Sequence, residues 1–346
     1  MENNHFVSVI IPCRNEEKYI KNCIESVINQ IYPKEKLEIL IIDGMSNDKT
    51  RDIIKKYEEK YSFIKLLDNP KKIVPTAMNI GIKNAKGDII IRMDAHAEYP
   101  DDYISKIVYW LEKSGADNVG GIWITRPGSN TLIAKSIALA LSSPFGVGNA
   151  LFRIGVKEPR EVDTVPFGAY RKEVFDKIGL FDEEFIRNQD DELNLRLLRN
   201  GGKILLIPDI VSYYYARDSL SKLWRMYFQY GYWKVRVIQK HKIPASLRHL
   251  VPISFILSIV GSMIVGLFYE IGFYLLGVII ILYVLTSFIF SFKDAIKQGL
   301  RYLPVLPLVF STIHFAYGFG FLKGIWDFII RKKYKNNKIQ DMELTR

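Results

Sequence analysis

The sequence has few cysteines and lacks the common nucleotide-binding loops. Its 346 residues include two cysteines, Cys13 and Cys23, too few for a disulfide framework and not spaced as metal ligands. Neither Gly-x-x-x-x-Gly-Lys-Ser nor Gly-x-Gly-x-x-Gly occurs, so a P-loop ATPase and a dinucleotide-binding fingerprint are not supported. The start, MENNHFVSVIIP, lacks a basic segment followed by an apolar core and a cleavage site, so we expect no secretory signal.

Charged residues are also absent from three long stretches in the second half of the chain. Residues 250–269, 271–292 and 303–322 contain no Asp, Glu, Lys or Arg. Each is about 20 residues long, which is enough for a helix to cross about 30 Å of hydrocarbon. Only Glu270 separates the first two stretches, so they are expected to form a tight antiparallel hairpin. The pattern predicts a multi-pass protein of the cell membrane whose first 215 residues are cytoplasmic.

The positive charge of the chain belongs to the same half. Residues 216–346 hold 18 lysines and arginines but 6 aspartates and glutamates, whereas residues 1–215 hold 30 against 31. Basic residues beside apolar spans mark the cytoplasmic side of a membrane and attract anionic headgroups. We therefore expect the lipid bilayer, and not nucleic acid, as the partner of this charge.

The third apolar stretch conflicts with this charge rule. A single crossing by residues 303–322 would carry the basic residues of segment 331–338 outside. The stretch also contains His314 and two prolines, and polar groups at membrane depth are usually buried against protein or functional. This favours a re-entrant or interfacial segment. The predicted order is a catalytic domain (1–215), an interface region (216–248), a membrane domain (249–330, with the hairpin 250–292 and a third segment 303–326) and a basic cytoplasmic tail (331–346).

Residues 219–241 read as one amphipathic helix. Aromatic and aliphatic residues such as Leu223, Trp224 and Tyr227 recur along one side, and lysines and arginines are interspersed. This composition is typical of a helix that lies in the membrane interface. The alternative is a helix packed on its own domain.

The first 100 residues alternate short apolar runs with longer segments of helical spacing. FVSVII, LEILII and GDIIIRM indicate buried parallel strands, with helices at about 17–30, 49–60 and 74–85. This alternation predicts a doubly wound α/β sheet, in which ligands bind beyond the carboxyl ends of the strands. Polar clusters at 12–17, 43–50 and 94–96 fall at such strand ends. Their convergence is the main indication of a binding site.

Asp94 and His96 are the first candidates for chemistry. Residues at i and i+2 on a strand point the same way, so both can reach one divalent cation or its bound phosphates. Mixed oxygen and nitrogen ligation suits Mn²⁺ or Mg²⁺, and the imidazole favours Mn²⁺. Asp-x-His pairs also occur often by chance in loops. At the exit of a buried strand, the metal-binding interpretation is the better one.

The second candidate is the acidic segment NQDDELNLRLLRN at 188–200. Its polar residues precede leucines at helical spacing, which places the carboxylates at a helix N-terminus, where the helix dipole stabilises their charged form. Simple capping would explain the pattern if it stood alone. A charged, positioned carboxylate is also what a general base must be.

Five ordered motifs resemble glycosyltransferase family 2, over roughly the first 215 residues. They are VSVIIPCRNEE, EILIIDGMSNDKT, IRMDAHAEYPDDYI, VPFGAYRKEVFDKIGLFDEEF and NQDDELNLRL, and HFAYGFGFLKG extends the likeness into the membrane part. The chain is most similar to the exopolysaccharide transferases of succinoglycan type. The resemblance implies a GT-A fold, a nucleoside diphosphate sugar donor, with a UDP-sugar as the first guess, and inversion at the transferred sugar.

The resemblance also implies roles for individual residues. Donor binding maps to Pro12, Asn15, Glu16, Asp43 and Asp94. The Asp-x-Asp metal motif corresponds to Asp94-Ala95-His96, with His in place of the second Asp. The catalytic base corresponds to Asp190, with Asp191 as a possible alternative. Acceptor binding maps to Phe167, Gly168, Ala169, Gln229 and Trp233; the Gln-x-x-Arg-Trp of processive members lacks its Arg here.

Three functions follow from these observations. The first is an enzyme that adds one sugar to a polyprenyl-diphosphate-linked saccharide at the cytoplasmic face. The second is a polyprenyl-phosphate monosaccharide synthase similar to dolichyl-phosphate mannose synthases, which would use a bare lipid phosphate as acceptor. The third is a catalytically silent membrane scaffold, against which the set of Asp94, His96 and Asp190 speaks.

Overall fold

A computed structural model describes residues 5–336, so the part of the predicted basic tail from 337 onward lies outside the described residues. The chain divides into two units. The first comprises Met1–Ile124 with Ile154–Tyr215, and the second comprises Thr125–Arg153 with Ala216–Arg346. Residues 125–153 thus belong to the second unit, although they lie between two parts of the first in the sequence.

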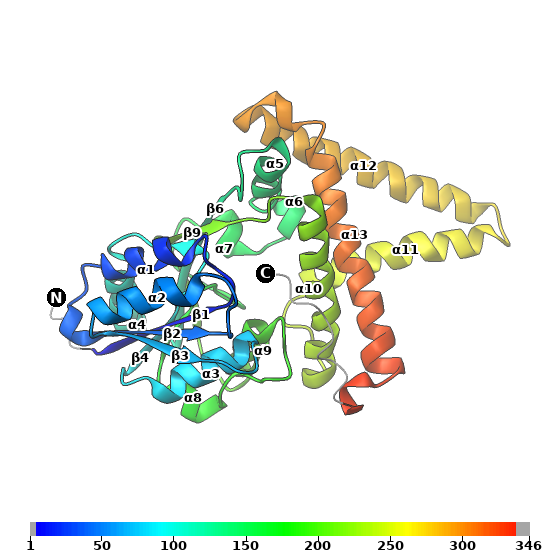
Figure 1. Cartoon of the computed structure of the whole chain (residues 1–346). Coiled ribbons are helices and arrows are strands. Elements are labelled where there is room, and N and C mark those ends of the chain that lie inside the picture. Colours follow the sequence, from blue (N-terminus) through cyan, green and yellow to red (C-terminus); the bar gives the residue numbers. More distant parts are fainter. Residues whose placement is uncertain (1–4, 337–346) are drawn as a thin grey trace. The chain divides into compact units, whose positions relative to one another are not determined.

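Four parallel strands form one side of the sheet in the first unit (Figure 1). Within residues 5–336, nine strands join in one sheet, ordered β3-β2-β1-β4-β8-β6-β9-β5, with β7 beside β9. β1 pairs in parallel with β2 and β4, and β2 pairs with β3. β1, β2 and β4 are buried along their whole length, as expected of parallel strands covered on both faces. The parallel strands are β1 (Val7–Cys13), β2 (Leu37–Asp43), β3 (Ile64–Asp68) and β4 (Ile89–Arg92).

The other side of the sheet is antiparallel. β8 pairs with both β4 and β6, and β9 pairs with β5 and β7. β8 therefore joins the antiparallel strands to β4, the last of the parallel strands. The strands are β5 (Ala97–Glu98), β6 (Asn118–Arg126), β7 (Arg160–Glu161), β8 (Ala169–Arg171) and β9 (Ile204–Tyr215).

The helices of the first unit confirm the expected alternation, with shifted ends. Arg171 ends β8, where it pairs with Ile89 of β4, and the next helix begins at Glu173. The helices are α1 (Ile20–Ile28), α2 (Thr50–Lys60), α3 (Val74–Asn84), α4 (Tyr103–Ser114), α8 (Glu173–Ile178) and α9 (Gln189–Arg199).

An ion-pair triad ties the start of β1 to two later elements. His5 Nδ1 contacts Asp88, which also accepts a hydrogen bond from the Phe6 amide, and His5 Nε2 lies 2.7 Å from Glu112 Oε1. The hydrogen bond to Asp88 is the main cause that raises the pKa of His5 above 6.5, and burial opposes it. Both carboxylates are about half exposed, so the triad contributes about 1 kcal/mol or less.

We expect this triad to make stability fall with rising pH. Because the folded state raises the pKa of His5, its contribution is complete below the unfolded value of about 6.5 and is lost as the pH rises through the folded pKa. Thermal unfolding of the full chain in detergent between pH 6 and 8 checks this. His5→Gln should flatten the pH dependence; an unchanged slope in the variant would contradict the assignment.

The second unit is helical in its described part. Residues 125–153 contribute α5 (Leu132–Ala140), α6 (Pro144–Val147) and α7 (Leu151–Ile154), of which α7 ends at the unit boundary. The C-terminal part contributes α10 (Leu220–His241), α11 (Val251–Gly266), α12 (Ile271–Gln298) and α13 (Leu306–Gly324), which continues as a π-helical turn, Ile325–Ile330. His314 of α13 contacts the Phe145 carbonyl oxygen through Nε2 at 2.8 Å, which ties α13 to α6.

Within residues 5–336, three helices are long and apolar enough to cross a membrane: Leu247–Gly266, Ile271–Gln298 and Leu306–Ile330. The first two form the expected hairpin, which projects away from α13 in Figure 1. Within an 18-residue apolar stretch of each helix, 22% and 11% of the residues of the first two helices are buried inside the protein, against 50% for the third. The third segment is one uninterrupted helix and is covered by protein over much of its surface.

α10 and α13 run side by side and parallel to each other, and their backbones are in close contact (Figure 1). A Cβ on Gly231 would lie 2.0 Å from the Tyr317 carbonyl oxygen, and a Cβ on Gly320 would lie 2.0 Å from that of Phe228. Small residues at helix crossings permit this approach. Much of the apolar face of α10 is therefore packed on its own unit, as in the alternative that the sequence left open.

Candidate active site

The first two polar clusters predicted from the sequence lie against each other at the ends of β1 and β2. The amides of Asn15 and Glu16 donate to the hydroxyls of Ser46 and Thr50, each at 2.8 Å. In return, the Asn15 side chain accepts from the Asn47 amide at 3.0 Å. Asn15 has a positive φ of 54°, a conformation that Asn tolerates better than most residues. The predicted donor-binding residues Pro12, Asn15, Glu16 and Asp43 thus share one edge of the sheet.

Asp43 is fully buried at this edge and is held from two sides. Its carboxylate accepts hydrogen bonds from the amide and hydroxyl of Ser46 and from Arg51 Nη1, the last at 2.6 Å. Arg51 also binds Asp68 at 2.8 Å, so one guanidinium bridges the ends of β2 and β3. These contacts fix the orientation of the Asp43 carboxylate.

His96 points back toward the first cluster. Its Nδ1 lies 3.3 Å from a carboxylate oxygen of Glu16 and, among the residues that the structure describes, has no hydrogen-bond partner. The His96 ring also meets the edge of Tyr214. This contact joins the segment after β1, which holds Glu16, to the segment after β4, which holds Asp94 and His96. The two segments are about 80 residues apart in the sequence.

These side chains fit a divalent cation whose remaining ligands come from the phosphates of the substrate. Within residues 5–336, no three His, Cys, Asp or Glu side chains are grouped so that they could hold a metal by themselves. Mg²⁺ and similar ions are commonly bound by one or two protein carboxylates together with substrate phosphates. The imidazole of His96, whose Nδ1 makes no hydrogen bond in the described residues, and the carboxylate of Asp94 are the side chains that match that pattern.

Arg92 joins Asp94 to Asp190, and the sequence analysis missed it. Its Nε donates to Asp94 Oδ1 at 2.9 Å, its Nη2 to Asp94 Oδ2 at 3.4 Å, and its Nη1 to Asp190 Oδ1. Burial alone would lower the pKa of Arg92, but Asp190 and Asp94 outweigh it, so the pKa is raised and the guanidinium stays charged. The side chain of Arg92 therefore connects the polar cluster at 94–96 with the acidic segment at 188–200.

Asp190 lies in the first turn of α9, as predicted, together with Asp191 and Glu192. Its side chain is 38% exposed, against 17% for Asp94. Loss of solvation raises the pKa of Asp190, Arg92 lowers it, and Asp94 raises it again; the net direction is upward. A carboxylate with increased proton affinity, held near other charged groups, is suited to accept a proton.

A buried amide network supports α9 one turn below Asp190. Asn194 is fully buried, accepts hydrogen bonds from Asn118 and Tyr170 at 3.0 and 3.1 Å, and donates to Thr164 at 2.8 Å. These partners lie on or beside β6 and β8, so the helix that carries Asp190 is fixed to the sheet.

The predicted acceptor residues Phe167, Gly168 and Ala169 lie beside Arg92. The Arg92 amide donates to the Gly168 carbonyl oxygen at 3.1 Å. A Cβ on Gly168 would lie 2.4 Å from Asn118 Oδ1, so the position has no room for a larger residue. The side chains of Phe167 and Ala169 are buried. Their acceptor role stays a prediction.

Gln229 and Trp233 lie in the second unit, on α10. Trp233 is fully buried and packs against Phe328, and Gln229 is 5% exposed. Their acceptor role also stays a prediction.

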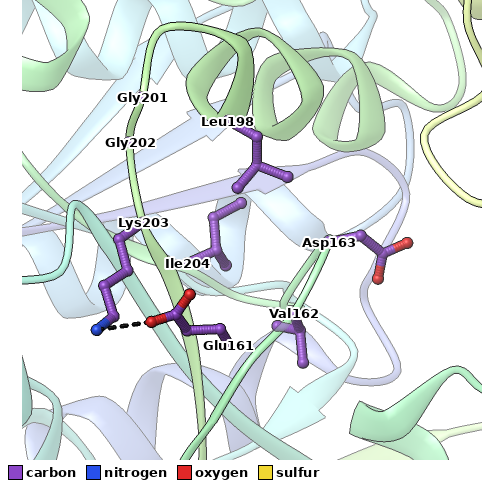
Figure 2. Close-up of a pocket in the computed structure, with 8 residues that line it drawn as sticks. All are labelled: Glu161, Val162, Asp163, Leu198, Gly201, Gly202, Lys203 and Ile204. Carbon is purple, nitrogen blue, oxygen red and sulfur yellow. Dashed lines mark ion pairs between the residues drawn. The ribbon is translucent and has the colours of Figure 1, made fainter.

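A separate hollow lies on the first unit beside β7 and the start of β9 (Figure 2). Lys203 and Glu161 form an ion pair of 2.8 Å across it. None of the predicted site residues lines it. The lining residues are Glu161, Val162, Asp163, Leu198, Gly201, Gly202, Lys203 and Ile204.

The α/β sheet with acidic groups at the carboxyl ends of its strands is a GT-A-like fold, followed by helices long and apolar enough to span a membrane. Residues 8–179 match the model of the family "Glycosyl transferase family 2". Together with the relatives described next, this match shows that the chain belongs to glycosyltransferase family 2, as the motifs predicted.

Two curated relatives are similar over nearly their whole length. A dolichyl N-acetyl-α-D-glucosaminyl phosphate 3-β-D-2,3-diacetamido-2,3-dideoxy-β-D-glucuronosyltransferase of Methanococcus voltae is 35% identical over 93% of this chain and 97% of its own length. The succinoglycan biosynthesis protein ExoA of Rhizobium meliloti is 30% identical over 92% and 95%. The solved mannosyltransferase PcManGT of Pyrobaculum calidifontis, in complex with GDP-Man and Mn²⁺, superposes with a TM-score of 0.61 at 17% identity, covering 94% of this chain and 88% of that one.

Proposed function

We propose that this enzyme transfers one sugar, with inversion, from a nucleoside diphosphate sugar to a lipid-linked saccharide at the cytoplasmic face of the membrane. The observation that carries the proposal is the bridge of Arg92 between Asp94 and Asp190, because one guanidinium binds both the predicted donor-binding carboxylate and the predicted base. The Methanococcus voltae relative, whose name specifies a dolichyl phosphate-linked sugar acceptor, supports this acceptor class over a bare lipid phosphate.

In the proposed reaction, Asp190 accepts the proton of an acceptor hydroxyl while its oxygen forms a bond to the anomeric carbon. The bond between that carbon and the diphosphate oxygen breaks on the opposite face, which inverts the configuration. The raised pKa of Asp190 favours proton uptake, and the amide network under α9 fixes its position. Asp43 and Asn15, held at the ends of β1 and β2, would bind the nucleoside.

Asp94 and His96 would hold a divalent cation together with the diphosphate. The chemistry that such a cation supplies when bound is neutralisation of charge on the departing diphosphate. Mn²⁺ is favoured over Mg²⁺ by the imidazole ligand, and the Mn²⁺ complex of the PcManGT neighbour is in line with that choice.

A transfer assay tests this function. Purified full-length protein would be incubated with UDP- and GDP-sugars, Mn²⁺ or Mg²⁺, and either bare polyprenyl phosphate or a lipid-linked saccharide. We expect transfer to the saccharide, with inverted anomeric configuration by NMR. Transfer to the bare phosphate would instead support a polyprenyl-phosphate monosaccharide synthase, and no transfer with any pair would support the silent scaffold.

For the membrane part, we propose that α11 and α12 cross the bilayer as a hairpin and that α13 does not span it. The apolar surface of the hairpin is largely exposed, whereas half of the α13 window is covered by protein. This arrangement keeps Lys297, Arg301 and Arg331 on one side, as the positive-inside rule requires.

Cysteine labelling in intact cells checks this topology. Cys13 and Cys23 are buried, and burial raises the pKa of both thiols, so they should react slowly with maleimides. A membrane-impermeant maleimide added outside should label Glu270→Cys but neither Lys297→Cys nor Arg331→Cys before permeabilisation. Labelling of Arg331→Cys from outside would show that α13 spans.

A further inference from the structure

We propose that Arg92 is a positioning residue for sugar transfer, which fixes the base Asp190 relative to Asp94 by binding both carboxylates with one guanidinium. This inference rests on the proposed function. It concerns a residue for which neither the motifs nor the comparisons give a role.

The geometry leaves Arg92 little freedom for another task. Arg92 is the last residue of β4, and its side chain is 11% exposed. The Nε, Nη1 and Nη2 groups all donate to the two carboxylates. The guanidinium therefore binds both Asp94 and Asp190, and its positive charge stabilises both carboxylates.

Two like charges explain why such a bridge is needed. The carboxylates of Asp94 and Asp190 bind the same guanidinium, so they lie near each other, and a cation between them offsets their repulsion. β4 and α9 are separated by almost 100 residues of sequence. In the described residues, the Arg92 side chain binds both carboxylates and so connects the two elements.

A planar guanidinium can bind two carboxylates at fixed angles, whereas a lysine ammonium is a point charge on a flexible stem. A lysine at position 92 would keep the charge but lose this double orientation. A displacement of about 1 Å in a catalytic group can cost roughly 100-fold in rate. With donor and Mn²⁺ at saturation, the loss should therefore appear in kcat, because the contacts proposed for the nucleoside lie at the ends of β1 and β2.

The chain contains a matched control in Arg51. It also bridges two carboxylates, Asp43 and Asp68, but at the predicted nucleoside end of the site. Loss of this bridge should disturb donor binding and leave the base in place. The two arginines thus predict opposite kinetic effects from the same chemical change.

The test compares Arg92→Lys, Arg92→Met and Arg51→Lys with the wild-type full chain in detergent. For Arg92→Met we expect kcat to fall by about 100-fold or more, and for Arg92→Lys by about tenfold or more. The affinity for the nucleoside diphosphate without metal, measured by calorimetry, should change by less than about threefold in both. With Mn²⁺ it should fall by about tenfold, because Arg92 is an outer partner of the proposed metal ligand Asp94. Arg51→Lys should instead raise the donor KM while kcat at saturation stays within about threefold.

Three outcomes would overturn the role of Arg92. These are a wild-type kcat in Arg92→Lys, an equal loss of metal-free nucleotide affinity and kcat in the Arg92 variants, and a kcat loss in Arg51→Lys as large as that in Arg92→Lys. If Arg92→Met fails to fold by thermal melting, Arg92→Lys carries the test alone. Lys177→Met, on the exposed surface of α8, is the control for substitution itself.

A structural readout separates this inference from the proposed function. In crystals of Arg92→Lys, the Asp190 carboxylate should move or adopt more than one rotamer. An Asp190 carboxylate in its wild-type position would overturn the positioning role even if wild-type protein transferred no sugar. Absence of transfer by the wild type, with Asp190 displaced in the variant, would overturn the proposed function and leave the positioning role in place.

Discussion

Replacement of Asp190 by Asn is expected to lower kcat for sugar transfer by about 10²- to 10⁴-fold, the usual contribution of a general base. Asparagine keeps the size of the side chain and an oxygen that can accept from Arg92, but it cannot take up the acceptor proton at neutral pH. Binding of the nucleoside diphosphate should stay within about twofold, because the contacts proposed for the nucleoside lie elsewhere. Initial-rate kinetics and calorimetry on the same preparation measure both quantities.

Asp191→Asn is the matched control, since Asp191 is the adjacent carboxylate in the same helical turn. We expect it to lower kcat by less than about tenfold, well below the loss expected for a base. If Asp191→Asn loses as much activity as Asp190→Asn, or more, Asp191 is the base. If Asp190→Asn loses nucleotide binding and activity in equal measure, Asp190 belongs to the donor site instead.

Replacement of Asp94 by Asn is expected to weaken metal-dependent nucleotide binding by about 100-fold or more. Removal of even an outer partner of a metal ligand commonly costs 10- to 100-fold in metal affinity, and Asp94 is proposed to be a ligand itself. His96→Ala should have a smaller effect, roughly tenfold, because the substrate phosphates and Asp94 would still hold the ion. Calorimetric titration of a nucleoside diphosphate at increasing Mn²⁺ measures both.

His5→Gln provides a matched histidine control, because His5 pairs with Asp88 and Glu112 and is not part of the proposed site. Its metal titration should equal that of the wild type. Wild-type titration curves for Asp94→Asn and His96→Ala would contradict the proposed metal site, whatever their effect on kcat.

The architecture was largely predictable because its strongest signals are local. FVSVII, LEILII and GDIIIRM correspond to β1, β2 and β4, and the three apolar stretches correspond to α11, α12 and α13. The short strands β5, β7 and β8 span two or three residues, so they have no periodicity to recognise and exist because longer strands pair with them. The same holds for the assignment of residues 125–153 to the second unit, which depends on tertiary packing.

The candidate site was predictable in its composition but not in its connections. The residues at the ends of β1 and β2 were expected to converge, and they share hydrogen bonds. Arg92 lies in the predicted strand GDIIIRM, and its place two residues before Asp94 was the one local signal of a role. Its contact with Asp190 depends on the tertiary fold.

α10 shows where the sequence pattern is ambiguous. An aromatic and basic amphipathic helix fits the membrane interface and fits packing on a neighbouring helix equally well. Gly231 indicates close packing on α13, because a larger residue at this position would collide with the backbone of α13 at Tyr317. Glycine at that spacing was the part of the pattern that pointed to a helix crossing.

The most direct test of the account is a crystal structure of the full chain with a nucleoside diphosphate and Mn²⁺, with anomalous diffraction recorded to locate the metal. We predict an anomalous peak within coordination distance of Asp94 and His96, the diphosphate bound to that ion, and the Asp190 carboxylate about one sugar ring away. A metal and diphosphate bound elsewhere, with Asp94 still paired to Arg92 and distant from them, would contradict the central claim that these carboxylates form one transfer site.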